Sequence, residues 1–280
     1  MHRAIDSKLA GLGIAALALA SGAAQAEVTA TFTAASNYDF RGITQTALDP
    51  ALQASIDWEG ENGLYASLWG SNIDFGQYTP EDVYIPPPPL EPDTDPVNVD
   101  LNIEIDAVLG YAGSFTEDFG YDVGITYYKY LGNDDEGVNN FDYAEVYSGL
   151  GYKILGADVA AKFWYAWDYS NSGENAYYAE ANVESPLPWW DLGVALHFGR
   201  SGWDYWTDED NGLNSYYDWS VGLTRSFGRF DFAIKYIDGS DLKESDCSRS
   251  SIECGGEPAF SSQSTVYFGV ATTFPWGKEE

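Results

Sequence analysis

The chain has 280 residues, with 44 acidic and 13 basic side chains and a formal net charge of −31 at pH 7. Such an acidic protein repels polyanions, so nucleic acid is excluded as a partner, whereas cations and positively charged solutes are favoured. The 10 Trp and 21 Tyr, beside a single Met, suit strands with interfacial aromatic rings better than a helical core.

The first 26 residues have the features of a secretory signal peptide. Basic residues stand near the start, a run of small apolar residues follows over 9–20, and Ala-Gln-Ala at 24–26 has the form that signal peptidase cleaves. The apolar run is too short to span a bilayer as a helix, which disfavours a transmembrane anchor. The sequence therefore predicts a cleaved signal peptide over 1–26 and an exported domain over 27–280.

Apolar and polar residues alternate strictly along most of the exported domain, which is the period of a strand with two different faces. Most of the alternating stretches have about ten residues or more, the length that a tilted strand needs to cross a bilayer, whereas strands of soluble proteins average about five or six. The expected strands are 28–41, 50–60, 63–75, 97–114, 119–132, 141–154, 156–170, 176–185, 190–203, 214–227, 229–239 and 262–276.

The clearest alternation runs from Val97 to Gly113. It places Leu101 on an apolar face and Asp100 and Glu104 on a polar face. In a membrane barrel the first face would contact lipid and the second would line the interior.

The connections between the expected strands alternate between long and short. Odd connections include "GQYTPEDVYIPPPPLEPDTDP" and "DYWTDEDNGLN", whereas even ones are as tight as "EN" and "LG". Outer-membrane barrels have long outer loops and short periplasmic turns, whereas a secreted sandwich has no reason to sort its loops in this way. The prediction is an all-β fold: one up-and-down transmembrane barrel of about 12 antiparallel strands in the cell outer membrane.

Aromatic residues gather near the ends of the expected strands, where the two interfaces of a membrane would lie. The expected members of these aromatic girdles are Tyr38, Phe40, Trp58, Trp167, Tyr169, Trp189, Trp190, Trp203 and Trp276. The last strand, "VYFGVATTFPWGKEE", resembles the signal that barrel-assembly machinery reads, with matches at Tyr267, Gly269 and Phe274. Thr272 and the added "GKEE" tail depart from that signal.

The segment "SNYDFRGITQTALDPALQASIDWEGENGLYASLWGSNIDFG" at 36–76 resembles the opening of the TorF-type porin family of proteobacteria, formerly a conserved family of unknown function. The resemblance continues through "NIEIDAVLGYAG", "ITYYKY" and "YAEVYSGLGY" to about residue 152, and it is looser beyond. It implies an outer-membrane barrel of porin type without an established substrate, and "IPPPPLEPDTDP" is an elaboration within the loop over 77–97. The matching positions are Ser36, Asn37, Tyr38, Phe40, Arg41, Gly42, Thr44, Gln45, Pro50, Gln53, Gly63, Tyr65, Trp69, Ser71 and Asn72.

Charged residues on the polar faces are the candidate functional residues. Carboxylates on neighbouring strands repel one another unless water or cations lie between them, so this set predicts a wet interior that prefers cations. Twelve strands would enclose a narrow channel for ions and small polar solutes. By parity we interpret the following residues as pore-lining: Asp39, Arg41, Asp57, Asp100, Glu104, Asp106, Asp122, Asp158, Lys162, His197, Asp231 and Lys235, with Asp191 on the same face.

Arg41 has two readings, which the sequence leaves open. It could shape a constriction and its local field near the outer mouth. It could equally form an ion pair with a carboxylate and tie the first loop to the barrel.

Cys247 and Cys254 lie in one polar segment and are expected to form a disulfide that closes a small loop in an oxidising compartment. No histidine stands near them, and no acidic loop shows the spacing of a known calcium loop, so the sequence suggests no metal site. No cofactor is expected. The expected partners are the lipid bilayer, small polar or cationic solutes and the barrel-assembly machinery, while the sequence leaves homo-oligomerisation open.

Two other function classes are compatible with a barrel. One is a closed structural or surface-interaction barrel that acts through its long loops. The other is a lipid hydrolase, which needs a nucleophile beside a base. The exported domain has one histidine, His197, and Ser201 is near it in sequence, but no local spacing places a serine against the ring, so we expect no enzyme activity.

Overall fold

The computed structural model describes residues 27–74, 101–132, 141–207, 214–240 and 264–275, together with the backbone of two short strands at 77–78 and 97–98. The predicted signal peptide, most of the proline-rich loop, the acidic loop segments, Asp100, both cysteines and Trp276 lie outside the described residues. Among the described residues, no helix is both long and apolar enough to cross a bilayer.

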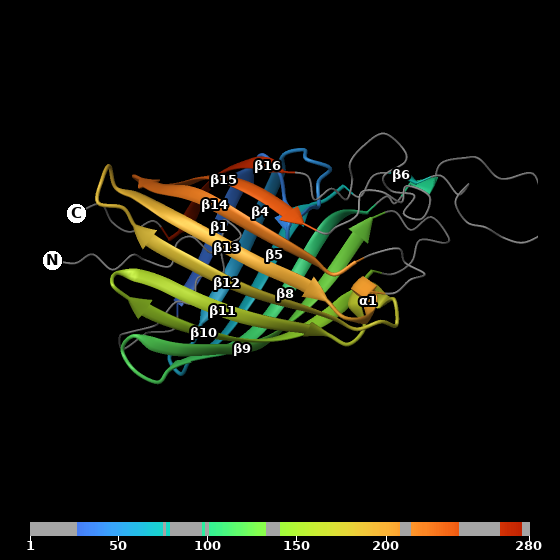
Figure 1. Ribbon diagram of the computed structural model, residues 1–280, viewed down its shortest axis with the longest axis horizontal. Helices are drawn as coiled ribbons and strands as arrows, with labels where there is room; N and C mark the ends of the chain where they lie inside the picture. The colour runs from blue at the N-terminus through green and yellow to red at the C-terminus, as the bar shows by residue number, and fades with distance from the viewer. Residues whose placement is uncertain are drawn as a thin grey trace, which may run out of the picture.

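Twelve antiparallel strands close into one barrel (Figure 1), in the ring order β1, β16, β15, β14, β13, β12, β11, β10, β9, β8, β5 and β4. Ladders between β1 and both β4 and β16 complete the ring. The strands are β1 (Glu27–Ala35), β4 (Ala51–Glu59), β5 (Leu64–Asn72), β8 (Leu101–Ser114), β9 (Phe119–Gly132), β10 (Tyr143–Ile154), β11 (Ala157–Ala166), β12 (Ala176–Pro186), β13 (Leu192–Gly202), β14 (Tyr216–Phe227), β15 (Phe230–Ser240) and β16 (Thr265–Phe274). The predicted all-β barrel is confirmed, and the other sheets among the described residues are two pairs of two-residue strands, which do not cover the barrel as a sandwich would require.

The two ends of the barrel differ. The start of β1, the end of β16 and all the short turns lie at one end, which we call the turn end. The turn between β10 and β11 contains only Leu155 and Gly156, both with positive φ, as a two-residue hairpin of strongly twisted strands requires. The strand ends that the long connections join lie at the opposite end, the loop end, where Figure 1 also shows α1. Five smaller elements belong to these connections: β2 (Asp39–Phe40), β3 (Ile43–Thr44), β6 (Gln77–Tyr78), β7 (Val97–Asn98) and α1 (Asp204–Thr207), with a 3₁₀ turn η3 (Tyr169–Asn171).

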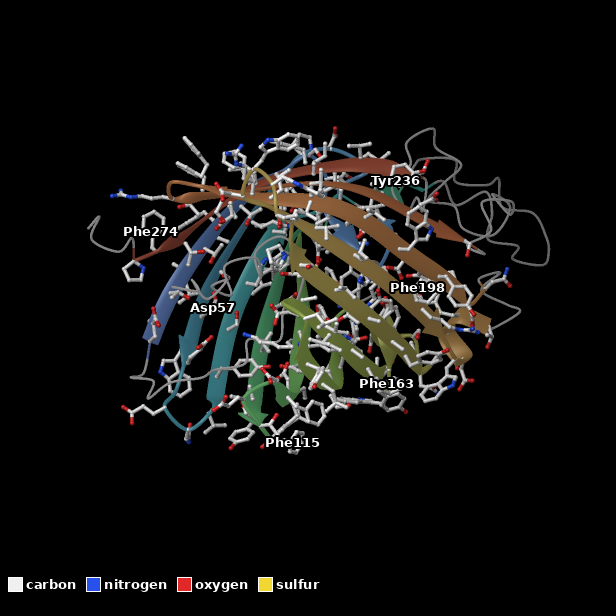
Figure 2. All side chains as sticks on the ribbon, turned by 60° about the vertical axis from the view of Figure 1, so that its left-hand side comes forward. Asp57, Phe115, Phe163, Phe198, Tyr236 and Phe274 are labelled. Carbon is white, nitrogen blue, oxygen red and sulfur yellow. The ribbon has the colours of Figure 1, made fainter. Side chains whose placement is uncertain are left out.

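The wall has an apolar outside and a polar inside, as the alternation predicts. On β1, Thr31 and Thr33 are 8% and 5% exposed and face inward, whereas Phe32 between them is 54% exposed. Figure 2 shows further aromatic side chains standing out from the ring, such as Phe115, Phe163 and Phe198. The outer surface is therefore a continuous belt of exposed apolar side chains, which a monomeric water-soluble protein rarely presents.

All twelve predicted strands are present, but the first one ends earlier than predicted. We expected it to continue to residue 41, whereas β1 ends at Ala35 and the chain then turns into the barrel. The backbone N–H of Ser36 still donates to the carbonyl of Phe268 on β16, and the ladder stops there. The end of the strand was predicted too late because apolar and polar residues also alternate over 36–41. The apolar residues of this stretch pack inside the barrel and do not face outward.

Leu101 is a second correction. The pattern placed it on the lipid face, but it is 8% exposed and packs in the interior. The ladder between β8 and β9 shifts register between Leu101 and Ile103. Because of this irregularity, Leu101 faces the interior while Ile103 faces outward. The sequence does not reveal the irregularity, since the alternation continues through it without a break.

The predicted location at a membrane interface is wrong for three of the girdle residues. Tyr38 and Tyr169 are each 8% exposed, and Phe40 packs beside Tyr128, so all three lie among the interior aromatic residues. The other described members are exposed, namely Trp58, Trp167, Trp189, Trp190 and Trp203.

Candidate functional site

The chain between β1 and β4, residues 36–50, folds into the barrel, and we call it the inward segment. The side-chain oxygen of Asn37 accepts hydrogen bonds from the hydroxyls of Thr44 and Thr46, at 2.5 and 3.1 Å. The backbone N–H of Gln45 donates to the carbonyl of Tyr38 at 2.7 Å. These bonds hold the short hairpin of β2 and β3 together without help from the wall.

The hairpin tip reaches the far side of the barrel. At the tip, Gly42 has φ +79°, and a Cβ built there would lie 2.5 Å from Cβ of Asp218 on β14. Arg41, beside it, contacts β10, which lies five strands from β1 in one direction round the ring and seven in the other. The inward segment thus crosses the interior at the loop end.

The Arg41 guanidinium sits in a site built by the opposite wall. Its Nη1 and Nη2 donate to Oε1 and Oε2 of Glu145 at 2.8 and 2.5 Å, a bidentate pair in which the two side chains are 8% and 0% exposed. The Tyr128 hydroxyl donates to the same carboxylate at 3.0 Å. The guanidinium carbon lies 4.5 Å from the ring centre of Tyr178 and 5.6 Å from that of Trp164. Of the two readings left open by the sequence, the structure shows the ion pair that ties the loop to the wall.

A second carboxylate site lies on β8, where Glu104 and Asp106 both face inward. Glu104 is 1% exposed, and its Oε1 accepts a hydrogen bond from the Tyr38 hydroxyl at 3.3 Å. The carboxyl groups of Glu104 and Asp106 lie within hydrogen-bonding reach of each other. Neither of them forms an ion pair within the described part of the chain.

A third cluster lies nearer the turn end. Lys162 Nζ lies 2.8 Å from Oδ2 of Asp122, and the hydroxyl of Tyr65 donates to Oδ1 of the same carboxylate at 2.6 Å. The Tyr65 hydroxyl also contacts that of Tyr147, whose ring centre lies 5.0 Å from Lys162 Nζ. Side chains from β5, β9, β10 and β11 thus meet across one sector of the interior.

His197 lies inside the barrel, as predicted, and both of its ring nitrogens are engaged. Nε2 lies 2.7 Å from Oδ1 of Asp218, and Nδ1 lies 2.7 Å from Oδ1 of Asn182. The Tyr178 hydroxyl lies 2.9 Å from Nε2. Within the described residues the ring contacts two carboxylates, an amide and a phenol, since Oε2 of Glu180 also lies 3.8 Å from Nδ1.

Asp39 lies in the inward segment, and Gly42 donates its backbone N–H to the carboxylate at 3.3 Å. Burial and, secondly, the charge of Asp218 raise the pKa of Asp39 to about 7.

The remaining predicted residues also face inward. Asp57 (Figure 2) accepts a hydrogen bond from Ser55 at 2.7 Å, and Asp231 accepts one from Ser226 at 2.5 Å. Lys235 is 7% exposed, and its Nζ lies 5.1 Å from the ring centre of Tyr267. The side chain of Asp158 is 41% exposed at the turn end.

One assignment by parity is wrong. Asp191 was assigned to the interior, but it lies in the exposed turn between β12 and β13 with φ +52°. The chain leaves the ladder there, so the alternation of strand faces no longer applies.

Four interior carboxylates were not predicted from the sequence: Glu145, Glu180, Glu184 and Asp218. On β10, tyrosines share the interior face with Glu145, so that face did not stand out as polar. On β14 the signal was present, because Asp218 alternates with the exposed Trp219 and Val221.

The described interior is predominantly acidic. Its basic groups are Arg41, Lys162 and Lys235, with Lys153 near the turn end. Its carboxylates are Asp39, Asp57, Glu104, Asp106, Asp122, Glu145, Asp158, Glu180, Glu184, Asp218 and Asp231. No group of three or more His, Cys, Asp or Glu side chains is placed to hold a metal ion within this part of the chain.

Comparison with solved structures places the chain among barrels. A KdgM porin aligns with a TM-score of 0.51 at 8% identity, covering 89% of this chain and 99% of the porin. A NanC porin follows with 0.49 at 11% identity, covering 89% and 100%. The outer membrane phospholipase A from Escherichia coli gives 0.44 at 12% identity, covering 89% and 96%. At these identities the first alignment shows a shared fold, and the other two carry no further conclusion.

Comparison with curated protein sequences found no match. The sequence does match one family over residues 19–274, and that family is described as "Bacterial protein of unknown function (Gcw_chp)". The TorF resemblance stays a prediction, whereas the porin-like barrel fold is shown. The chain belongs to the Gcw_chp family.

Proposed function

We propose that the protein is an outer-membrane channel of porin type that passes ions and small polar solutes and prefers cations. The observation that carries this proposal is one closed barrel with an apolar outer belt and a charged inner wall. In hydrocarbon, every backbone donor and acceptor must be paired internally, and a closed barrel meets that requirement. The apolar belt would be solvated by lipid, and the carboxylates inside would be solvated by water and cations.

The inward segment forms the constriction of this channel. It crosses the interior at the loop end, where buried aromatic side chains such as Tyr143 and Trp206 pack around it. At the rim of the turn end the side chain of Asp158 is 41% exposed, whereas those of Arg41 and Glu145 are 8% and 0% exposed. A solute would therefore meet its narrowest passage beside Arg41, on the outer side of the membrane.

The cation preference follows from the balance of interior charges. A wall that carries more carboxylates than basic groups lowers the energy of a cation and raises that of an anion, and low-dielectric surroundings strengthen the effect. The twelve predicted pore-lining residues, from Asp39 to Lys235, are proposed to act as a group in this way.

Export and assembly belong to the same proposal. Residues 1–26 act as a cleaved signal peptide, the barrel-assembly machinery recognises the last strand, and an oxidising compartment joins Cys247 to Cys254. Intact mass measured before and after reduction tests both the cleavage and the disulfide. A purified chain that retains residues 1–26 would contradict the cleavage. A chain whose free thiols are first blocked, and which then gains no mass on reduction and alkylation, would contradict the disulfide.

Planar bilayers test the channel function. Purified protein is reconstituted in a bilayer with a KCl gradient across it. We expect discrete conductance steps and a reversal potential that lies between zero and the equilibrium potential of K⁺. Migration on gels before and after boiling checks that the barrel is folded. Folded protein that gives no steps, both as wild type and as a variant with a displaced inward segment, would favour the closed structural barrel instead.

A further inference from the structure

Among the described residues, Glu104 and Asp106 lack the ion pairs that Glu145 and Asp122 form, and each has a buried oxygen without a hydrogen-bond partner, as Glu184 also does. Oε2 of Glu104 and Oδ1 of Asp106 are buried and have no hydrogen-bond partner. A buried carboxylate oxygen without a partner is costly, so this site is incomplete as it stands.

Two arrangements would satisfy the pair. One is a single proton shared between the two carboxyl groups, which lie within hydrogen-bonding reach of each other. The other is a cation placed against both. Asp106 is the less buried residue of the two, although its Oδ1 is itself buried.

The surroundings favour an organic cation over a metal ion. In the ladders, Asp106 lies between Trp69 on β5 and Tyr128 on β9, while Glu104 lies next to Tyr130. Tyr38 of the inward segment packs edge-on against Trp69, with ring centres 5.2 Å apart. Aromatic faces attract ammonium and guanidinium groups, whereas Ca²⁺ requires six to eight oxygen ligands, which a pair of carboxylates does not supply.

The same wall already holds a guanidinium in this chemistry. Glu145 lies on β10, which is separated from β8 only by β9. Its carboxylate and the rings of Trp164 on β11 and Tyr178 on β12 surround Arg41. The site on β8 has the same components, a carboxylate and aromatic rings, but the chain supplies no cation to it from the described residues.

We propose that the Glu104–Asp106 pair binds the ammonium or guanidinium group of a small organic cation, with the surrounding rings against its charged face. This inference rests on the proposed channel function and names its solute class. The binding site would lie directly beside the constriction, where a solute loses most of its hydration and gains most from paired carboxylates.

Binding of methylguanidinium to the purified full-length protein in detergent micelles tests this inference by calorimetry and tryptophan fluorescence. We expect saturable binding to the wild type and a loss of affinity of about tenfold or more in the Glu104→Gln/Asp106→Asn double variant, because the cation then bonds to neutral amide oxygens and no longer to carboxylates. Asp118→Asn is the matched control, since it removes one carboxylate from the exposed turn between β8 and β9 and should bind as the wild type does.

Three results would overturn the inference. The wild type fails to bind methylguanidinium, the double variant binds it as tightly as the wild type, or K⁺ and Ca²⁺ bind the pair while methylguanidinium does not. The second result would mean that the pair holds only a proton. If the double variant does not fold, as judged by migration on gels, Asp106→Asn alone is measured, because this residue is the less buried of the two.

The binding assay needs no current, so it separates this inference from the channel function. Methylguanidinium binding without conductance would remove the channel and keep the site. Conductance without methylguanidinium binding would remove the site and keep the channel.

Discussion

Arg41 and Glu145 are 104 residues apart in the sequence, yet they form a bidentate ion pair inside the barrel, with N···O distances of 2.8 and 2.5 Å. The arginine belongs to the inward segment and the glutamate to the opposite wall. This pair therefore ties the segment to the opposite wall, together with the hydrogen bond from Tyr38 to Glu104. Breaking a buried pair from one side costs about 3–5 kcal/mol, mostly because the remaining charge is left without a partner.

Replacement of Arg41 with alanine should release the inward segment from the wall while the barrel stays closed. The Glu145 carboxylate would be left buried and unpaired, and displacement of the segment lets water reach it. We expect a larger single-channel conductance and faster proteolysis within residues 36–50.

The Arg41→Ala/Glu145→Gln double variant is the control for that experiment. It removes the unpaired charge, so it should recover part of the protection of the segment, with a coupling energy of about 0.5–3 kcal/mol between the two sites. An Arg41→Ala variant with wild-type protection and conductance would show that the pair does not hold the segment.

Gly42→Ala should displace the inward segment by a different route. A Cβ at this position would lie 2.5 Å from Cβ of Asp218, and the wall strand cannot yield as a flexible side chain tip could. We expect higher conductance and loss of hydrogen-exchange protection at the backbone N–H of Gln45, which donates within the hairpin.

Gly228→Ala is the matched control for Gly42. Gly228 also has a positive φ, of +63°, but no atom lies within 4 Å of a Cβ built there. Both variants carry the same left-handed strain of roughly 1–2 kcal/mol, so their difference isolates the contact with the wall. Equal conductance in the two variants would mean that the tip of the segment is not tightly packed against β14.

Docking of the inward segment should weaken as the pH rises from about 4 to 7, because the pKa of Asp39 rises from 3.8 to about 7 in the docked state. The docked state holds the proton of Asp39 more tightly than the released state does. The contribution of Asp39 to the free energy of docking therefore decreases as the pH rises from about 4 to 7, and it is constant above about pH 7. The charges that face Asp39 are Asp218 on β14, His197 on β13 and Lys235 on β15, with the N–H of Gly42 as its hydrogen-bond donor.

Hydrogen exchange of the segment between pH 5 and 8, corrected for intrinsic exchange rates, measures this dependence. Asp39→Asn should remove the pH dependence of exchange that comes from Asp39 and leave any pH dependence that comes from His197. An unchanged pH dependence in Asp39→Asn would contradict the assignment.

The barrel could be predicted because its signal is spread over the whole chain. Alternation repeats on twelve strands and loop length follows parity, so an error at one residue, such as Leu101 beside its irregular ladder, does not change the fold. The burial of Thr31 and Thr33 against the exposure of Phe32 illustrates why: lipid and interior demand opposite side chains at each step.

The candidate site was predicted less completely, because it depends on contacts between strands that are far apart in sequence. Arg41 was placed in the interior, but its partner Glu145 was missed, since no local spacing relates them. The turn of the chain after Ala35 was also missed. The hydrogen bonds that turn it inward, from Thr44 and Thr46 to Asn37, are made by polar residues that read equally well as part of a strand.

Removal of the positive charge at Lys162 should increase the preference of the channel for cations. Lys162 Nζ lies 2.8 Å from Oδ2 of Asp122, and in Lys162→Gln the carboxylate would keep its hydrogen bond from Tyr65 but lose its counter-ion. The interior becomes more negative by one charge, so the reversal potential in a KCl gradient should move closer to the equilibrium potential of K⁺. Lys162→Arg keeps the charge and should keep the wild-type potential.

Arg225→Gln separates this effect from a change in total charge. Arg225 is exposed on the outer face of β14, so its loss changes the net charge of the protein by the same amount without changing the interior. Its reversal potential should equal that of the wild type. The difference between Lys162→Gln and the wild type should shrink at 1 M salt, where the screening length is only about 3 Å. A Lys162→Gln channel with unchanged or weaker cation preference would mean that permeating ions do not pass the Asp122 carboxylate, and the proposed path through the interior would then be wrong.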